Sequence, residues 1–327
     1  MLKISEGKKA ALERLSSKNG IIEALAIDQR GSLKKMMASF GENNAEEEII
    51  HFKKAASEEL TKYASAILLD PEYGLPAAKE RAANAGLLLA YEKTGYDIST
   101  PGRMPDVLED WSVARLKEKG ADAIKFLLYY NPDDDRRINH LKHVFVERLG
   151  SECEGEDIPF FLEIVTYDTD IEDVHSADFA RIKPRKVIES TREFAKPKYH
   201  VDVLKLEVPV DMNYVEGFSD SESVYSRKEA LSYFKEQSEA AALPFIFLSA
   251  GVTMELFQET IKFAKEAGST FNGVLCGRAT WRDGVKPYVM NGEEAGKEWF
   301  RTKGRDNIET LNEIVEQSAS SWRDKVE

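Results

Sequence analysis

Short apolar runs recur along the 327-residue chain, and each ends in polar residues before an amphipathic segment begins. The runs are continuously apolar rather than alternating, which is typical of parallel strands that are covered on both faces. We therefore predict eight strands, at Ile21–Asp28, Ser65–Asp70, Gly86–Glu92, Ala123–Tyr130, Pro159–Val165, Val203–Val208, Phe245–Gly251 and Gly273–Arg278.

The segments between these runs show helical periodicity, with apolar residues at spacings of three and four. One series consists of Ile49, Phe52, Ala56, Leu60 and Tyr63, and another near the C-terminus consists of Ile308, Leu311, Val315, Ala319 and Trp322. Glycines that precede the next strand are expected to cap the helices before them, namely Gly120, Gly150 and Gly268. Strands and helices are therefore predicted to alternate along the chain.

This alternation fits either a closed (β/α)8 barrel or an open, doubly wound sheet. An open sheet usually carries a glycine-rich phosphate loop after its first strand. Here the first strand is followed by "DQRGSLKKMM", which matches neither the GxGxxG pattern nor the P-loop pattern. We therefore predict an α/β protein: one (β/α)8 TIM-barrel domain over residues 1–327, with an N-terminal extension and a C-terminal helix. The Lys183–Lys198 segment, rich in lysine, arginine and proline, is expected to be a surface excursion.

The composition excludes some classes of partner. A formal net charge of −13 argues against nucleic acid, because a phosphate backbone requires a basic surface, although a small anionic substrate needs only a few local cations. Cys153 and Cys276 have no CxxC spacing, so neither a disulfide framework nor a zinc knuckle is expected. No run approaches the ~20 apolar residues of a membrane span. We expect a cytoplasmic protein, and a homo-oligomer is compatible with the sequence.

Polar groups stand at the ends of the predicted strands, where a barrel places its catalytic residues. They are Asp28, Asp70, Glu92, Lys125, Glu163, Lys205, Ser249 and Arg278. Charges that face the interior of a barrel are costly unless they are paired or functional. This regular placement in the most apolar segments therefore marks a candidate active site.

Three of these charges suggest a specific chemistry. If strand order follows chain order, Glu163 and Lys205 lie on neighbouring strands ~4.8 Å apart, with Lys125 one strand further. A buried lysine near a second cation loses its proton more easily, and a neutral amine can form a Schiff base with a carbonyl. A nearby carboxylate can move the protons that carbon–carbon cleavage requires. The alternative is a structural ion pair between Lys205 and either Glu163 or Glu207.

The last two strands end in turns that suit a phosphate. Backbone N–H groups after these strands bind phosphate in many barrels, and an arginine can hold it with a planar fork. The candidate residues are Ser249, Ala250, Gly251, Gly277 and Arg278. The alternative is that both segments are only tight turns between a strand and a helix.

A metal site is not expected, and no other cofactor is implied. None of the five histidines lies at a strand end, and His140 and His143 form only an i, i+3 pair on the helix predicted over Asp135–Leu149. The acidic turn Leu69–Gly74 could hold magnesium, but a cap or a polar rim explains it as well.

Several motifs together resemble the tagatose 1,6-diphosphate aldolases, the class I enzymes of the bacterial tagatose 6-phosphate route for lactose and galactose. They include "ALAIDQRGSLKKMM", "SAILLDPEYGLPA", "ADAIKFLLYY", "VDVLKLEVPV", "LSAGVTMELFQET" and "FNGVLCGRATW". The resemblance runs from about residue 20 to the final helix. It implies a (β/α)8 barrel and Schiff-base cleavage of a ketohexose bisphosphate to dihydroxyacetone phosphate and glyceraldehyde 3-phosphate.

The resemblance also implies roles for individual residues. Lys205 matches the Schiff-base lysine, Glu163 the acid/base glutamate, and Lys125 the lysine of strand four. Asp28 and Gln29 match the Asp-Gln pair after strand one, and the phosphate-binding turns match Ser249–Gly251 and Gly277–Arg278. Members of this family tolerate several stereoisomers of the bisphosphate. Two other hypotheses are a sugar-phosphate sensor that regulates through a partner protein, and another Schiff-base enzyme such as a transaldolase or a dehydratase.

Overall fold

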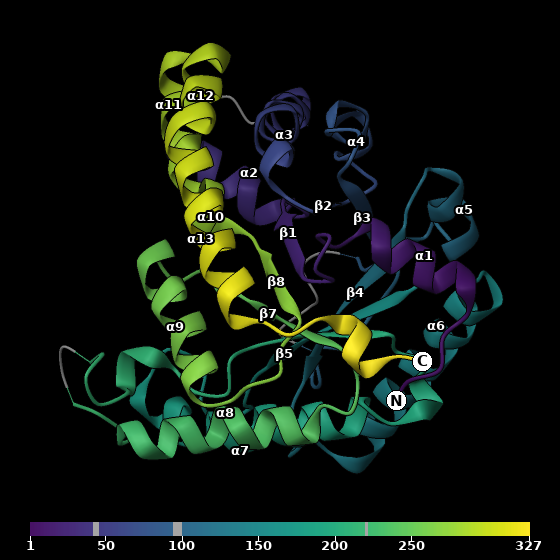
Figure 1. The fold of residues 1–327 in the computed structure, drawn as a ribbon, viewed down its shortest axis with the longest axis vertical. Coiled ribbons are helices and arrows are strands. Elements are labelled where there is room, and N and C mark those ends of the chain that lie inside the picture. Colours follow the sequence, from purple (N-terminus) through teal and green to yellow (C-terminus); the bar gives the residue numbers. More distant parts are fainter. Residues whose placement is uncertain (42–45, 94–99, 220–221) are drawn as a thin grey trace.

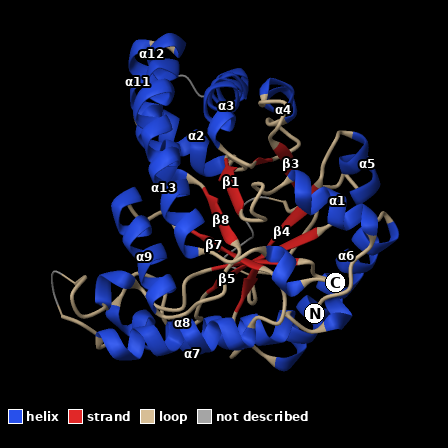
Figure 2. Ribbon diagram, viewed as in Figure 1, coloured by secondary structure: helices blue, strands red, loops and turns tan. Residues whose placement is uncertain are grey.

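Parallel strands form a closed barrel at the centre of the protein (Figure 1, Figure 2). The computed structural model describes residues 1–41, 46–93, 100–219 and 222–327. Within these ranges, eight strands follow one another around the barrel in chain order, and β8 pairs with β1. They are β1 Ile22–Ala26, β2 Ala66–Leu69, β3 Gly86–Ala90, β4 Ala123–Tyr130, β5 Phe160–Thr166, β6 Val203–Leu206, β7 Phe245–Leu248 and β8 Gly273–Cys276. The predicted fold class is confirmed.

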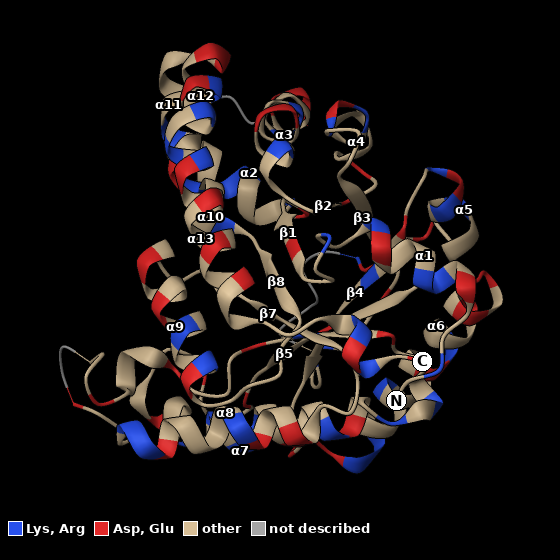
Figure 3. Cartoon of the chain, in the orientation of Figure 1, with Lys and Arg blue, Asp and Glu red and all other residues tan. Residues whose placement is uncertain are grey.

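Helices surround the strands, as Figure 2 shows. They are α1 Glu6–Arg14, α2 Gly31–Ala38, α3 Glu46–Leu60, α4 Leu75–Glu80, α5 Val113–Glu118, α6 Arg136–Gly155, α7 Ala177–Phe194, α8 Arg227–Ala240, α9 Met254–Glu266, α10 Arg278–Trp281, α11 Val285–Asn291, α12 Glu293–Trp299 and α13 Arg305–Ser318. Most charged residues lie on these outer helices, whereas the strands are largely uncharged (Figure 3). The few charges that the strands carry are therefore exceptional.

The strand register brings two of the predicted site residues face to face. Glu163 of β5 lies opposite Lys205 of β6, as the chain-order argument predicted. Lys125 of β4 lies opposite Phe161, two residues before Glu163 on the same face of β5. The three side chains therefore point into the barrel at similar heights.

The two ends of the chain close the barrel at the N-terminal ends of its strands. Leu12 and Leu15, at the end of α1, pack with Trp322 against the first interior layer of the barrel. Leu2 forms a parallel bridge with Val326, so the termini lie side by side (Figure 1). The C-terminal helix was predicted to include Trp322, but α13 ends at Ser318 and Trp322 lies in a separate 3-10 turn. With this end covered, the opposite mouth is left for a substrate.

Two further predictions were wrong. The Lys183–Lys198 segment is not a surface excursion, because its first part belongs to α7 and Lys186 is completely buried against carboxylates.

The second prediction, that three glycines cap the helices before them, is wrong for one of the three. Gly120 and Gly268 follow α5 and α9 with φ of 91° and 73°, as a C-terminal cap requires. Gly150, in contrast, lies inside α6, where the helix passes close to the main chain of Tyr199.

Gly150→Ala is expected to destabilise the protein, because a Cβ there would collide with the carbonyl oxygen of Tyr199. Overpacking of this kind costs about 1–3 kcal/mol in the free energy of unfolding, measurable by urea denaturation. Gly155→Ala at the end of α6 is the matched control, because no atom lies within 4 Å of a Cβ at that position. Equal stability of the two variants would contradict the close approach.

None of the helices in the described ranges is long and apolar enough to cross a membrane.

Candidate active site

A lysine, a glutamate and a second lysine meet inside the barrel. The Glu163 carboxylate lies between the two amines, with Oε1 2.9 Å from Nζ of Lys205 and Oε2 2.7 Å from Nζ of Lys125. All three side chains are buried: Lys205 is 4 % exposed, Glu163 8 % and Lys125 1 %. The structure thus brings together the three charges that the sequence selected.

Two more carboxylates complete the cluster around Lys125. Its Nζ lies 2.9 Å from Oδ2 of Asp28, at the end of β1, and 2.5 Å from Oε1 of Glu92, after β3. Glu92 was predicted to stand at a strand end but was not among the predicted site residues. Its proximity to Lys125 follows from β3 and β4 being neighbours, which the chain order of the strands already implies.

Opposing effects set the protonation of this cluster. Burial disfavours a charge on Lys125, but Asp28, Glu163 and Glu92 outweigh it and hold the pKa of Lys125 well above its usual range. Burial acts to raise the pKa of Glu163, but Lys125 and Lys205 outweigh it, so the pKa of Glu163 is lowered. For Glu92, burial prevails and the pKa is raised. At neutral pH, Glu163 is therefore a carboxylate beside a charged Lys125.

Lys205 has a different environment from Lys125. Within the described residues, Lys205 forms one ion pair, with Glu163, whereas Lys125 contacts three carboxylates. Of the two amines, Lys205 is the one less enclosed by carboxylates, and Glu163 stands 2.9 Å from it as a proton acceptor.

The turns after β7 and β8 lie against each other. Ala250 and Gly251 have φ of 49° and 78°, and a Cβ at Gly251 would come within 2.9 Å of the Arg278 guanidinium. Glycine at position 251 therefore leaves room for the arginine. Arg278 is exposed at the start of α10, directly after Gly277, and pairs with no described carboxylate. Ser249 is buried at the base of the same turn.

Gln29 connects the β1 end of the cluster to these turns. Its Nε2 donates a hydrogen bond of 3.1 Å to Oδ1 of Asp28 and lies 3.5 Å from the place of a Cβ on Gly277. Its Oε1 is buried and has no hydrogen-bond partner among the described residues. This acceptor is available to a hydroxyl group of a ligand.

Other strand-end carboxylates are engaged elsewhere. Oε2 of Glu207 accepts hydrogen bonds of 2.7 Å from both the backbone N–H and the hydroxyl of Thr166, so this residue joins β5 to β6. Asp70 is paired with the buried Lys53, and Glu72 with Arg30. The acidic turn Leu69–Gly74 therefore forms ion pairs with neighbouring cations, in keeping with a polar rim.

No cluster of three histidine, cysteine, aspartate or glutamate side chains in the described ranges is arranged to hold a metal ion. His143 instead lies 2.9 Å from the Tyr130 hydroxyl through Nε2. The groups that the site offers are its lysines, its carboxylates and the turns after β7 and β8.

Comparison with known proteins identifies the family. A model described as DeoC/LacD family aldolase matches residues 22–283, which span β1 to the segment after α10. The chain belongs to the DeoC/LacD family of aldolases. The tagatose 1,6-diphosphate aldolase 2 of Enterococcus faecalis is 65% identical over 327 residues, covering 100% of this chain and 99% of the relative. The tagatose 1,6-diphosphate aldolase of Staphylococcus epidermidis is 56% identical over 98% of this chain and 99% of its own.

Solved structures share the fold of this DeoC/LacD family aldolase. A fructose-bisphosphate aldolase from Plasmodium falciparum superposes with a TM-score of 0.69 over 98% of both chains, at 15% identity. A Schiff-base-forming fructose-1,6-bisphosphate aldolase gives a TM-score of 0.58, at 16% identity, covering 94% of this chain and 98% of its own. At these identities the likeness concerns the barrel itself.

Proposed function

We propose that the protein is a class I aldolase, a lyase that reversibly cleaves D-tagatose 1,6-bisphosphate to dihydroxyacetone phosphate and D-glyceraldehyde 3-phosphate. The observation that carries this proposal is the buried Lys205, whose amine lies 2.9 Å from Glu163 at the centre of an aldolase-family barrel. Relatives that are 65% and 56% identical bear the name tagatose 1,6-diphosphate aldolase. The setting we propose is the cytoplasm and the tagatose 6-phosphate route.

In the proposed mechanism, Lys205 Nζ attacks the C2 carbonyl of the open-chain sugar. Glu163 takes a proton from the Lys205 ammonium and gives it to the C2 oxygen as the freed amine attacks. It then takes a second proton from the bound nitrogen and gives it to the C2 hydroxyl, which leaves as water and yields the iminium. Glu163 then takes the proton of the C4 hydroxyl while the C3–C4 bond breaks. The electron pair of that bond moves into the iminium, which becomes an enamine, and glyceraldehyde 3-phosphate departs. Protonation at C3 and hydrolysis release dihydroxyacetone phosphate and the free lysine.

We assign Lys125 an electrostatic role. The sequence does not show whether Lys125 acts on the pKa of Lys205 or contacts a phosphate. Three carboxylates already surround its amine, which leaves little positive potential for a phosphate. The charge of Lys125 keeps Glu163 ionised and so ready to accept protons. Asp28 positions Lys125 through their ion pair. It also accepts a hydrogen bond from Gln29 and so orients that side chain at the β1 side of the site.

We assign the substrate phosphate nearest the Schiff base to the turns after β7 and β8. Ser249, Ala250 and Gly251 supply backbone N–H groups, and Gly277 allows a close approach of the main chain. Arg278 supplies a fork of donors that can bind two phosphate oxygens. The proposed reaction needs no metal ion and no cofactor, because the iminium serves as the electron sink.

Arg278→Ala is expected to raise KM for tagatose 1,6-bisphosphate about 10-fold or more and to change kcat much less. A charge-assisted contact with the phosphate is lost, while the lysines and Glu163 remain in place. Steady-state kinetics measures both constants. The control is Arg282→Ala, whose guanidinium lies 3.5 Å from the carboxylate of the adjacent Asp283. An unchanged KM in Arg278→Ala would contradict the phosphate assignment.

A coupled cleavage assay in EDTA tests the proposed function. The protein is given tagatose 1,6-bisphosphate or fructose 1,6-bisphosphate, and the release of triose phosphate is followed. We expect cleavage of both bisphosphates, since the family tolerates stereoisomers, and full activity in EDTA. Cleavage that EDTA abolishes would contradict the Schiff-base mechanism. Tight binding of the bisphosphates without turnover would instead support the sugar-phosphate sensor.

A further inference from the structure

Several cations that reach the strands or the loops after them are paired with carboxylates. Such pairs are Arg30 with Glu72, Lys53 with Asp70, Lys142 with Asp134, Lys186 with Asp133 and Asp168, and Lys205 with Glu163. Two arginines at the C-terminal ends of the strands, Arg103 and Arg278, form no ion pair with any carboxylate of the described ranges. Arg278 belongs to the phosphate-binding turns already described. Arg103 has no assigned role.

Arg103 lies on the segment between β3 and α5 and is held by two aromatic rings. Its guanidinium carbon is 4.5 Å from the ring centre of Tyr167 and 5.3 Å from that of Tyr129. Stacking on a ring uses the face of a guanidinium and leaves its N–H edge available for other partners. The backbone of Arg103 has a φ of 42°, which is uncommon for a residue other than glycine and is often retained at functional positions.

Tyr129 places this arginine over the active site. Tyr129 and Lys125 are four positions apart on β4, so their side chains point to the same face of the strand. Tyr129 is the one nearer the C-terminal end of β4, and it is only partly buried. Arg103 therefore lies at the mouth of the barrel, above the cluster of Lys125 and Glu163.

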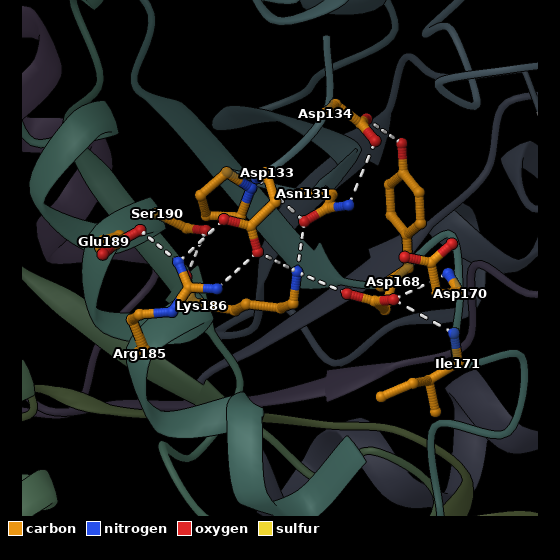
Figure 4. A network of polar contacts seen from close by, with 12 residues as sticks. Asn131, Asp133, Asp134, Asp168, Asp170, Ile171, Arg185, Lys186, Glu189 and Ser190 are labelled. Atoms are coloured by element: carbon orange, nitrogen blue, oxygen red, sulfur yellow. Dashed lines mark hydrogen bonds and ion pairs between the residues drawn. The ribbon is translucent and has the colours of Figure 1, made fainter. Parts of the chain in front are cut away.

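A buried polar network fixes the second ring. The Tyr167 hydroxyl donates a hydrogen bond to Asp134, and both are contacted by Lys142 Nζ, at 3.0 Å and 3.2 Å. Figure 4 shows how the loops that carry these residues are joined: Lys186 of α7 reaches Asp133 at 2.7 Å and Asp168 at 2.8 Å. The loops after β4 and β5 are therefore both joined to α7, and the two tyrosine rings under Arg103 stand on these loops and on β4.

Arg103 and Arg278 lie on opposite sides of Lys205. In the closed ring, β6 is two strands from β8, which Arg278 follows, and two strands from β4, which carries Tyr129. β4 and β8 lie on opposite sides of the barrel, about 15 Å apart for eight strands at ~4.8 Å spacing and a tilt of about 36°. A ligand bound covalently to Lys205 would therefore have one cation on each side.

We propose that Arg103 binds the substrate phosphate that is remote from the Schiff base, on the half that leaves as glyceraldehyde 3-phosphate. This assignment rests on the proposed function. The bisphosphate carries its two phosphates at opposite ends of a six-carbon chain. Its C1 phosphate is one carbon from the Schiff-base carbon and fits the turn after β7, the strand adjacent to Lys205. The C6 phosphate is four carbons away and reaches across the mouth to Arg103.

The condensation reaction tests this assignment, because the acceptor can be supplied with or without its phosphate. Arg103→Ala and Arg103→Gln are assayed with dihydroxyacetone phosphate and either D-glyceraldehyde 3-phosphate or D-glyceraldehyde. We expect kcat/KM for the phosphorylated acceptor to fall about 10-fold or more, and that for D-glyceraldehyde to stay within about twofold. Borohydride trapping of dihydroxyacetone phosphate should be unchanged in Arg103→Ala and weakened in Arg278→Ala.

The control variant is Arg148→Ala, which removes an exposed arginine from the outer surface of α6. It should react normally with both acceptors. An equal loss with both acceptors in the Arg103 variants would mean a structural role, and no loss with either would exclude a phosphate contact; both results overturn the assignment. Absence of condensation by the unmodified protein would refute the proposed function itself.

Discussion

Replacing Lys205 by methionine is expected to lower kcat for bisphosphate cleavage by a factor of about 10⁴ or more. Methionine keeps most of the buried hydrocarbon but cannot attack a carbonyl, so the covalent pathway is lost. The remaining lysine of the cluster cannot take over, since three carboxylates keep the pKa of Lys125 well above its usual range. The coupled assay measures the loss, and circular dichroism establishes that the variant is folded.

Two further variants separate nucleophilicity from charge. Lys205→Arg keeps a cation beside Glu163 but has no amine that can form a Schiff base, so it should be as inactive as the methionine variant. Lys183→Met removes another buried lysine, 3.7 Å from Glu207 and outside the cluster, and should retain turnover. Substantial cleavage by Lys205→Met would contradict the assignment of the nucleophile.

Glu163→Gln is expected to reduce kcat by about 10²- to 10⁴-fold, the range for loss of a general acid–base group. The amide has the same shape as the carboxylate and can still contact both lysines, but it cannot carry protons between substrate atoms. Dihydroxyacetone phosphate should still bind, and its Schiff base should form more slowly. Rapid quenching with borohydride measures that rate directly.

Glu207→Gln is the matched control for this variant. Glu207 is also a buried glutamate, two residues from Lys205, but it hydrogen-bonds Thr166 and does not reach the cluster. Its replacement should leave kcat within about threefold of the original value, because no proton transfer depends on it. Near-normal turnover in Glu163→Gln would mean that another group moves the protons.

The strands and the centre of the site could be predicted because both depend on local or sequential information. Continuous apolar runs identify buried parallel strands, and the order of strands in the barrel follows the order in the chain. Predicting that Glu163 and Lys205 are close required only those two facts, and the strand register confirms it. Lys125 joined them because β4 is the neighbour of β5.

Features that depend on contacts between distant segments were not predictable in the same way. A run of lysines on a helix does not show whether they face water or buried carboxylates, and Lys186 meets Asp133 and Asp168 from two other loops. Gly150 was read as a cap because its proximity to Tyr199 is not encoded locally. Arg103 does not follow directly on an apolar run, so the sequence does not mark it as a strand-end residue. Only its position over two tyrosine rings singles it out.

The most direct test of the central claim is to trap the covalent intermediate. The protein is incubated in EDTA with dihydroxyacetone phosphate, reduced with borohydride, digested and mapped by mass spectrometry. A stable adduct on Lys205 is predicted, because its amine lies 2.9 Å from Glu163 and is not enclosed by three carboxylates as that of Lys125 is. An adduct on Lys125 or any other lysine, or no adduct together with cleavage that requires a metal ion, would contradict the Schiff-base mechanism proposed for this site.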